Sequence, residues 1–302
     1  MKSTLFLIPS FILLSLFELE AQVDPVFLEE MLPFQKEVIA KLCGKSEISN
    51  GMFLTQRASP EEREITAGYL SNSLTAIGWK LENHHYKATN GNPFLDLILE
   101  PMQGINVAAV LPATILSDTY VVFGSHYDTE RGSPGAIDNA TGIALCLSVA
   151  RQLKQLENRK FNFMLVFFDQ EEDNEVGSRA YAKMLKTTQK NIHSVHTIDM
   201  VGWDNDNNKG VELELPAPEL ERLYNSVAQQ LKIPVYRTKV SSSDHKSFID
   251  QGFKALGISE EYVKRDSTPY YHTPKDTYDT VNFEYLSDTS YFIFNVFKTL
   301  LQ

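Results

Sequence analysis

The segment FNFMLVFFDQEE, residues 161–172, decides the fold class, because a long apolar run ends abruptly in charged side chains. Its central part, Phe163–Phe168, is apolar at every position rather than at alternate positions. Continuous apolar runs are typical of strands that helices cover on both faces. The segment therefore predicts a central strand of an α/β domain, with Glu171 and Glu172 at its carboxyl end.

Residues 120–128, YVVFGSHYD, repeat this pattern and end in His126 and Asp128. From residue 79 onward, strand-like and helix-like segments alternate, which favours one α/β domain with a mostly parallel or mixed twisted sheet between helices. The expected strands are residues 79–86, 105–112, 120–128, 161–169, 194–199, 211–215, 234–237 and 254–259. The expected helices are residues 26–42, 59–78, 218–231, 245–251 and 285–301, with another that begins near residue 141.

The helix at residues 59–78 has several independent signals. Ser59 can cap its first turn, Pro60 suits that turn, and Glu62 completes a capping box. Gly78 is expected to end the helix. By contrast, residues 263–281 form a long segment rich in Pro, Tyr and Asp, which predicts either a disordered loop or a functional one.

The first 22 residues predict a secretory signal peptide. Lys2 precedes an apolar stretch from Leu5 to Phe17, and Ala21 is a small residue at which a signal peptidase could cut. The stretch is shorter than the roughly 20 residues that span a bilayer. We therefore expect a secreted or periplasmic protein without membrane insertion in its mature form, with residues 23–302 as one domain. A buried N-terminal helix is the alternative, but no amphipathic pattern favours it.

Charge and cysteine content restrict the remaining classes. The formal net charge is −11 and no basic run occurs in the 302 residues, which argues against nucleic-acid binding. The two cysteines, Cys43 and Cys146, lie in segments that resemble apolar helix faces. Two free thiols are the favoured interpretation, although export would permit a disulfide.

Polar clusters follow three apolar strands, at His126 and Asp128, at Glu171 and Glu172, and at Asp199. In open α/β sheets the carboxyl ends of the strands line the ligand crevice. Carboxylates gathered there repel one another and lose hydration, at a cost of several kcal/mol per ion unless a cation compensates. A bound metal explains the cluster, and zinc is favoured because imidazoles accompany the carboxylates.

Six motifs make the chain resemble the co-catalytic dizinc aminopeptidases of the secreted bacterial leucyl aminopeptidase and aminopeptidase Y type. They are GSHYDT, GAIDNATG, EEDNEVGSRAY, TIDMVGW, SSSDHKSF and YYHTPKDT, in the family's order and at compatible spacings. The resemblance covers nearly all of residues 23–302. It implies a zinc exopeptidase-like fold, two Zn²⁺ ions per chain and peptide substrates with a free N-terminus, and we expect a monomer.

The resemblance also implies the metal ligands. His126 and Asp199 would bind one zinc, Glu172 and His272 the other, and Asp138 would bridge the two. One carboxylate shared by two cations suits the roughly 3.5–4 Å spacing of two-metal sites.

Two further carboxylates have implied roles without binding metal. Asp128 would orient the His126 imidazole, and Glu171 would act as general base toward the attacking water. A cis peptide between Asp138 and Asn139 is also implied. The chain departs from many relatives at Gln170, where Gly or Ala is common, and at Val240, where some have a tyrosine that steadies the tetrahedral intermediate.

Other functions remain as alternatives. The main one is glutaminyl-peptide cyclotransferase, a single-zinc enzyme whose members typically carry Trp before the late histidine, where this chain has Tyr271. Carboxypeptidase or dipeptidase action would use the same metal chemistry. A non-enzymatic receptor module is disfavoured because all five ligand types are present. Tyr262, Tyr270 and Tyr271 are candidates for the substrate pocket, whereas Asp244 and His245 are expected to cap a helix or form a wall.

Overall fold

A computed structural model describes residues 25–89, 94, 97–98 and 100–302. The predicted signal peptide, residues 1–22, lies outside the described residues. None of the helices in the described ranges has both the length and the apolar character required to cross a bilayer.

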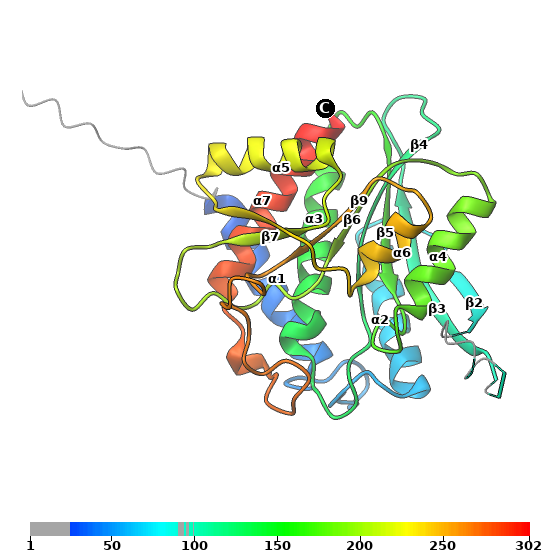
Figure 1. Cartoon of the computed structure of the whole chain (residues 1–302). Coiled ribbons are helices and arrows are strands. Elements are labelled where there is room, and N and C mark those ends of the chain that lie inside the picture. Colours follow the sequence, from blue (N-terminus) through cyan, green and yellow to red (C-terminus); the bar gives the residue numbers. More distant parts are fainter. Residues whose placement is uncertain (1–24, 90–93, 95–96, 99) are drawn as a thin grey trace, which may run out of the picture.

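Within the described residues, nine strands form one mixed sheet (Figure 1) in the order β1-β3-β5-β4-β6-β9-β7-β8, with β2 paired beside β3. Their bounds are β1 Lys80–Leu81, β2 His84–Ala88, β3 Met102–Leu111, β4 Thr119–His126, β5 Asn162–Phe168, β6 Asn191–Ile198, β7 Val211–Glu214, β8 Val235–Thr238 and β9 Ala255–Ser259. The central strands β5, β4, β6 and β9 are parallel, whereas β3 joins β5, and β7 joins β9, in antiparallel pairs. The predicted mixed sheet is therefore confirmed, and its parallel part lies at the centre.

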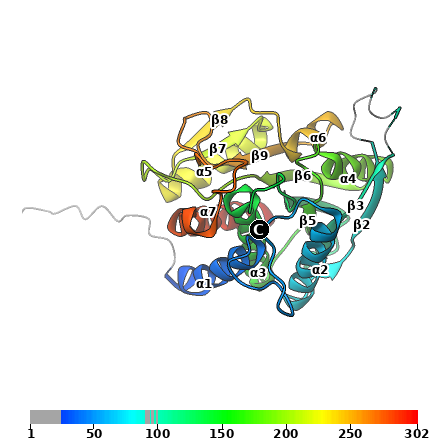
Figure 2. The same cartoon turned by 90° about the horizontal axis from the view of Figure 1, so that it is seen from below.

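Helices cover both faces of this sheet. They are α1 Pro25–Leu42, α2 Pro60–Ala76, α3 Gly142–Gln155, α4 Val176–Thr187, α5 Pro218–Leu231, α6 Asp244–Asp250 and α7 Phe283–Leu301. Alternate residues of β5 face opposite layers: Leu165 and Phe167 pack in the cluster with α3 and α7, and Val166 and Phe168 in the cluster with α4 and α6. Figure 2 shows these two pairs of helices on opposite sides of the sheet. The continuous apolar run in β5 is thus explained by burial on both faces.

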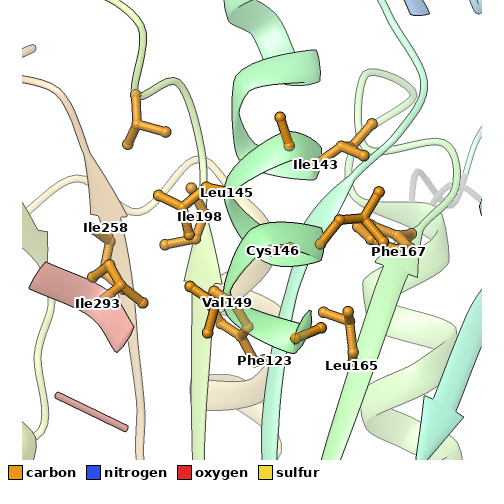
Figure 3. Packing of buried hydrophobic residues seen from close by; sticks show 14 of the residues in the cluster. Phe123, Ile143, Leu145, Cys146, Val149, Leu165, Phe167, Ile198, Ile258 and Ile293 are labelled. Carbon is orange, nitrogen blue, oxygen red and sulfur yellow. The ribbon is translucent and has the colours of Figure 1, made fainter. Parts of the chain in front are cut away.

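The larger core lies between α3, α7 and the central strands. Figure 3 shows Cys146 and Val149 of α3 packed over Phe123 and Leu165 of the sheet. Phe297 of α7 completes this contact, with its ring centroid 4.7 Å from that of Phe123. A rigid sheet buried in this way holds the loops at the carboxyl ends of β4, β5 and β6 in fixed positions.

The capping box of α2 is confirmed. The Glu62 amide donates to Ser59 Oγ at 3.3 Å, and the Ser59 amide donates to Glu62 Oε2 at 2.8 Å. Gly78, directly after the C-cap Ile77, has a positive φ of 78°, which suits glycine. Both cysteines are free, as the favoured interpretation predicted.

Two expectations need correction. The strand expected at residues 79–86 is broken into β1 and β2, because the Asn83 side chain accepts the Ala108 amide of β3 and interrupts the ladder there. In addition, α4 was not expected as a helix. It begins at Val176, after four polar or charged residues that hide its start, and its apolar residues Tyr181, Ala182 and Leu185 face the smaller core.

Candidate metal centre

The ends of three parallel strands bring the predicted polar residues together. His126 is the last residue of β4, Glu171 and Glu172 follow β5, and Asp199 follows β6 directly. Asp138 lies on a buried turn between β4 and α3, and its peptide bond to Asn139 is cis, as the resemblance implied. His272 reaches the same place from the loop after β9, so the long segment 263–281 is an ordered loop at the site.

The five predicted ligands form two groups that share Asp138. His126 Nε2 lies 3.2 Å from Asp138 Oδ1 and 3.3 Å from Asp199 Oδ1. His272 Nε2 lies 3.2 Å from Asp138 Oδ2 and 2.9 Å from Glu172 Oε2. Each oxygen of the Asp138 carboxylate therefore faces a different imidazole, and the remaining carboxylate of each group stands beside the same imidazole.

These separations suit tetrahedral zinc. Bonds of about 2.0–2.1 Å at tetrahedral angles place neighbouring ligand atoms about 3.3–3.4 Å apart. The distances between the nitrogen and oxygen atoms are 2.9–3.3 Å. The residues present thus fit metal binding in both donor set and spacing.

The electrostatics of the cluster favour added positive charge. Burial, and next the nearby Asp138 carboxylate, raise the pKa of Glu172 to about 7. Burial alone would lower the pKa of His272, but bonds to Asp138 and Glu172 outweigh it and raise the pKa to about 10. Without metal the site retains protons, which indicates that its carboxylates need a cation.

Two further carboxylates, Asp128 and Asp276, position the candidate ligands through hydrogen bonds from backbone amides. Asp128 accepts the amides of Glu171 and Glu172 at 3.0 and 3.2 Å, and its Oδ1 lies 3.6 Å from His126 Nδ1. Asp276 accepts the amides of Ile137 and Asp138 at 2.8 and 3.0 Å. Asp276 thereby joins the loop that carries His272 to the turn that carries Asp138.

Asp276 and Glu130 were missed by sequence reasoning. Asp276 lies within the quoted YYHTPKDT motif, four residues after His272, so its position was a usable signal. Glu130 forms a third group with Glu172 and His272, whose candidate ligand atoms lie within 4.8 Å of one another. It lies in a loop, and nothing in the local sequence distinguishes it from a solvated surface acid.

Glu171 lies in the same cluster. Its carboxylate, His126 and Glu172 have candidate ligand atoms within 4.8 Å of one another. Burial raises the pKa of Glu171 well above its ordinary value, while His126 opposes the rise. A carboxylate with a raised pKa beside a metal centre can accept a proton and release it again.

A cavity opens beside the centre, and Glu171, Asp199 and His272 are among the residues that line it. Tyr262 and Tyr271 line it, as does Val240, while Tyr270 packs its ring against Trp203 instead. Asp244 and His245 begin α6 and are buried, and neither belongs to the groups of candidate ligands within the described ranges. The remaining histidines lie elsewhere: His84, His85, His193 and the buried His196, which contacts Tyr224 and Ser194.

A mixed sheet between two layers of helices, with a carboxylate and histidine cluster at the carboxyl ends of its parallel strands, is the arrangement of a metal-dependent enzyme. The model of peptidase family M28 matches residues 106–296, and the chain belongs to this family. It is thus an enzyme of the metallopeptidase class, and the predicted resemblance is confirmed at the level of the family.

Relatives and solved structures agree with this assignment. A probable leucine aminopeptidase of Arthroderma otae is 25% identical in an alignment of 257 positions, which covers 72% of this chain and 68% of the relative. The chain spans only 40% of the length of aminopeptidase YwaD of Bacillus subtilis and 53% of the length of a second probable leucine aminopeptidase of Arthroderma otae. The structure of a zinc aminopeptidase from Bacillus subtilis covers 90% of this chain and 96% of its own length, with a TM-score of 0.77 and 14% identity. The structure of a glutaminyl cyclase of Bacteroides thetaiotaomicron bound to N-acetylhistamine covers 91% of this chain and 97% of its own length, with a TM-score of 0.70 and 17% identity. At these identities the structures show a common fold.

Proposed function

We propose that this protein is a zinc-dependent aminopeptidase with two zinc ions per chain. His126 and Asp199 would hold one ion, Glu172 and His272 the other, and Asp138 both. The observation that carries the proposal is the Asp138 carboxylate, whose two oxygens each lie 3.2 Å from a different imidazole. A single-zinc site would need only one of these two groups.

Zinc would polarise the peptide carbonyl and lower the pKa of the attacking water. Glu171 would take the proton of that water and transfer it to the leaving amine. Asp128 would keep Glu171 and Glu172 in place through their backbone amides and would orient His126. Asp128 therefore acts on geometry, whereas Glu171 moves the proton.

We propose peptides with a free N-terminus as substrates. The curated relative from Arthroderma otae is named as a probable leucine aminopeptidase, and a cavity that could receive the N-terminal residue adjoins the proposed metal centre. Export to the periplasm or the medium, removal of residues 1–22 and a monomeric state are parts of the same proposal. N-terminal sequencing and light scattering of the mature protein would test them.

One experiment separates this proposal from its main alternative. The purified protein would be analysed for zinc and incubated with aminoacyl amides and with a peptide that begins with Gln. Two zinc ions per chain with release of the N-terminal residue are expected. One zinc ion with conversion of Gln to pyroglutamate would overturn the proposal in favour of a glutaminyl cyclotransferase. Release of C-terminal residues would show that the protein is a carboxypeptidase instead, and cleavage of dipeptides alone would show that it is a dipeptidase.

A further inference from the structure

Two polar groups that line the cavity beside the metal centre have atoms without hydrogen-bond partners among the described residues. Glu214, the last residue of β7, lines the cavity and is only 4% exposed. Its Oε1 accepts the Ser259 hydroxyl at 3.0 Å, but within the described ranges its Oε2 has no hydrogen-bond partner. Ser243 also lines the cavity and is 2% exposed, and its Oγ likewise has no hydrogen-bond partner among the described residues. A buried carboxylate oxygen without a donor is unfavourable, so Glu214 favours a donor from outside the chain.

His245 does not supply that donor in its neutral form. Its Nδ1 lies 3.5 Å from Glu214 Oε2, and its Nε2 lies 3.1 Å from the Val240 carbonyl oxygen. A carbonyl oxygen only accepts, so Nε2 must carry the hydrogen, and Nδ1 of a neutral imidazole then has none to donate. Burial lowers the pKa of His245 to about 4, which keeps the ring neutral near pH 7.

The other carboxylates on the cavity are already occupied. Glu260 accepts three backbone amides, those of Gly202, Trp203 and Thr268, at 2.8–3.0 Å. Asp138, Asp199 and Glu171 belong to the proposed metal centre. The described residues that line the cavity include no lysine or arginine. Glu214 is therefore the carboxylate on the cavity for which the described residues supply no compensating cation. Burial, and next the Asp199 carboxylate, raise the pKa of Glu214 to about 8, and a bound cation would keep the carboxylate ionised.

We propose that Glu214 makes this cavity a binding site for a cationic side chain, so that the enzyme removes N-terminal lysine or arginine in preference to uncharged residues of similar length. The inference rests on the proposed aminopeptidase function, because the cavity adjoins the centre that would cleave the bond. An ammonium or guanidinium group offers several donors, which suit the Glu214 carboxylate and the Ser243 hydroxyl. Met200, Val240 and Tyr262 line the same cavity and provide apolar surface for the aliphatic stem.

Lysine and norleucine form the decisive pair of substrates, because norleucine has the unbranched four-carbon stem without the charge. With the zinc-loaded enzyme, kcat/KM for lysyl amide should exceed that for norleucyl amide by at least about tenfold, since a bond to a charged group contributes about 1.5–3 kcal/mol. Glu214→Gln should reduce this ratio about 10- to 100-fold and leave the norleucyl value within a few-fold. Glu157→Gln removes the same charge from an exposed loop after α3 and should leave the ratio unchanged.

The outcomes are distinguishable. If the native enzyme cleaves norleucyl amide as well as lysyl amide, or if Glu214→Gln leaves their ratio intact, the inference is wrong while the aminopeptidase proposal stands. If no aminoacyl amide is cleaved, the proposed function itself fails. Should Glu214→Gln not fold, inhibition of the native enzyme decides, because free lysine should compete better than free norleucine. Equal inhibition would overturn the inference.

Discussion

Replacement of Asp276 by asparagine should loosen the turn that carries Asp138. The carboxylate accepts two backbone amides, from Ile137 at 2.8 Å and from Asp138 at 3.0 Å, and the Asp276 side chain is fully buried. Asparagine has one acceptor oxygen, so its NH₂ group would face the second amide. The loss of one charge-assisted bond, together with an unpaired buried amide, should cost about 2–4 kcal/mol.

Calorimetry and a zinc competition assay would measure this effect. For a domain of this size, 1 kcal/mol shifts Tm by about 2 °C, so Asp276→Asn should lower Tm by about 4–8 °C. Zinc affinity should fall about 10- to 100-fold, as is usual when a residue that supports a metal ligand is removed. Asp279→Asn is the matched control, because Asp279 lies three residues further on, is exposed and contacts only Lys45 among the ion pairs of the described chain. If Asp276→Asn matched this control in both Tm and zinc affinity, the hydrogen bonds from the Ile137 and Asp138 amides to Asp276 would stabilise neither the fold nor the metal centre.

Three further changes test other parts of the molecule. Glu171→Gln should retain both metal ions and lower kcat about 10²- to 10⁴-fold, and near-normal turnover would exclude Glu171 as the proton carrier. In metal-free protein, neighbouring carboxylates outweigh burial and raise the pKa of His272 from 6.5 to about 10, so its stabilising contribution is complete below pH 6.5 and is lost as pH rises to about 10. Urea titrations should show that the free energy of unfolding falls between pH 6.5 and about 10, and His272→Gln should reduce this fall. An equal fall in the native protein and the variant would contradict the raised pKa of His272. Phe297→Ala should destabilise the protein by about 3–5 kcal/mol, because its buried ring packs against Phe123 and Phe163 at 4.7 and 4.8 Å, and a loss below 1 kcal/mol would show that the core refills the space.

The central strands were predictable because their burial on both faces leaves an unambiguous apolar run. The helix α5 was predicted with the bounds 218–231 that the structure has, since proline marks its start. By contrast, β1 and β2 were predicted as one strand. Their separation depends on Asn83, whose side chain replaces a backbone group in pairing with β3, and such a substitution is invisible without the partner strand.

The meeting of the five candidate ligands could be expected from the sequence, because parallel strands end at one edge of a sheet and the motifs identified the fold. The supporting residues were harder to predict. The motif that holds His272 makes Asp276 a candidate, but the sequence does not reveal that Asp276 accepts backbone amides of a distant turn. Whether Glu214 Oε2 receives a hydrogen bond depends on which nitrogen of His245 carries the hydrogen. Only the contact between His245 and the Val240 carbonyl oxygen reveals which nitrogen that is.

The loop that carries His272 has a consequence for the order of events during synthesis. A nascent chain that has emerged only as far as β9 already holds His126, Asp138, Glu172 and Asp199, yet it lacks the imidazole that faces Glu172. The second half of the proposed centre therefore cannot form until this late segment leaves the ribosome. Full metal loading, and with it proteolytic activity, would be delayed until nearly the whole domain has been translated.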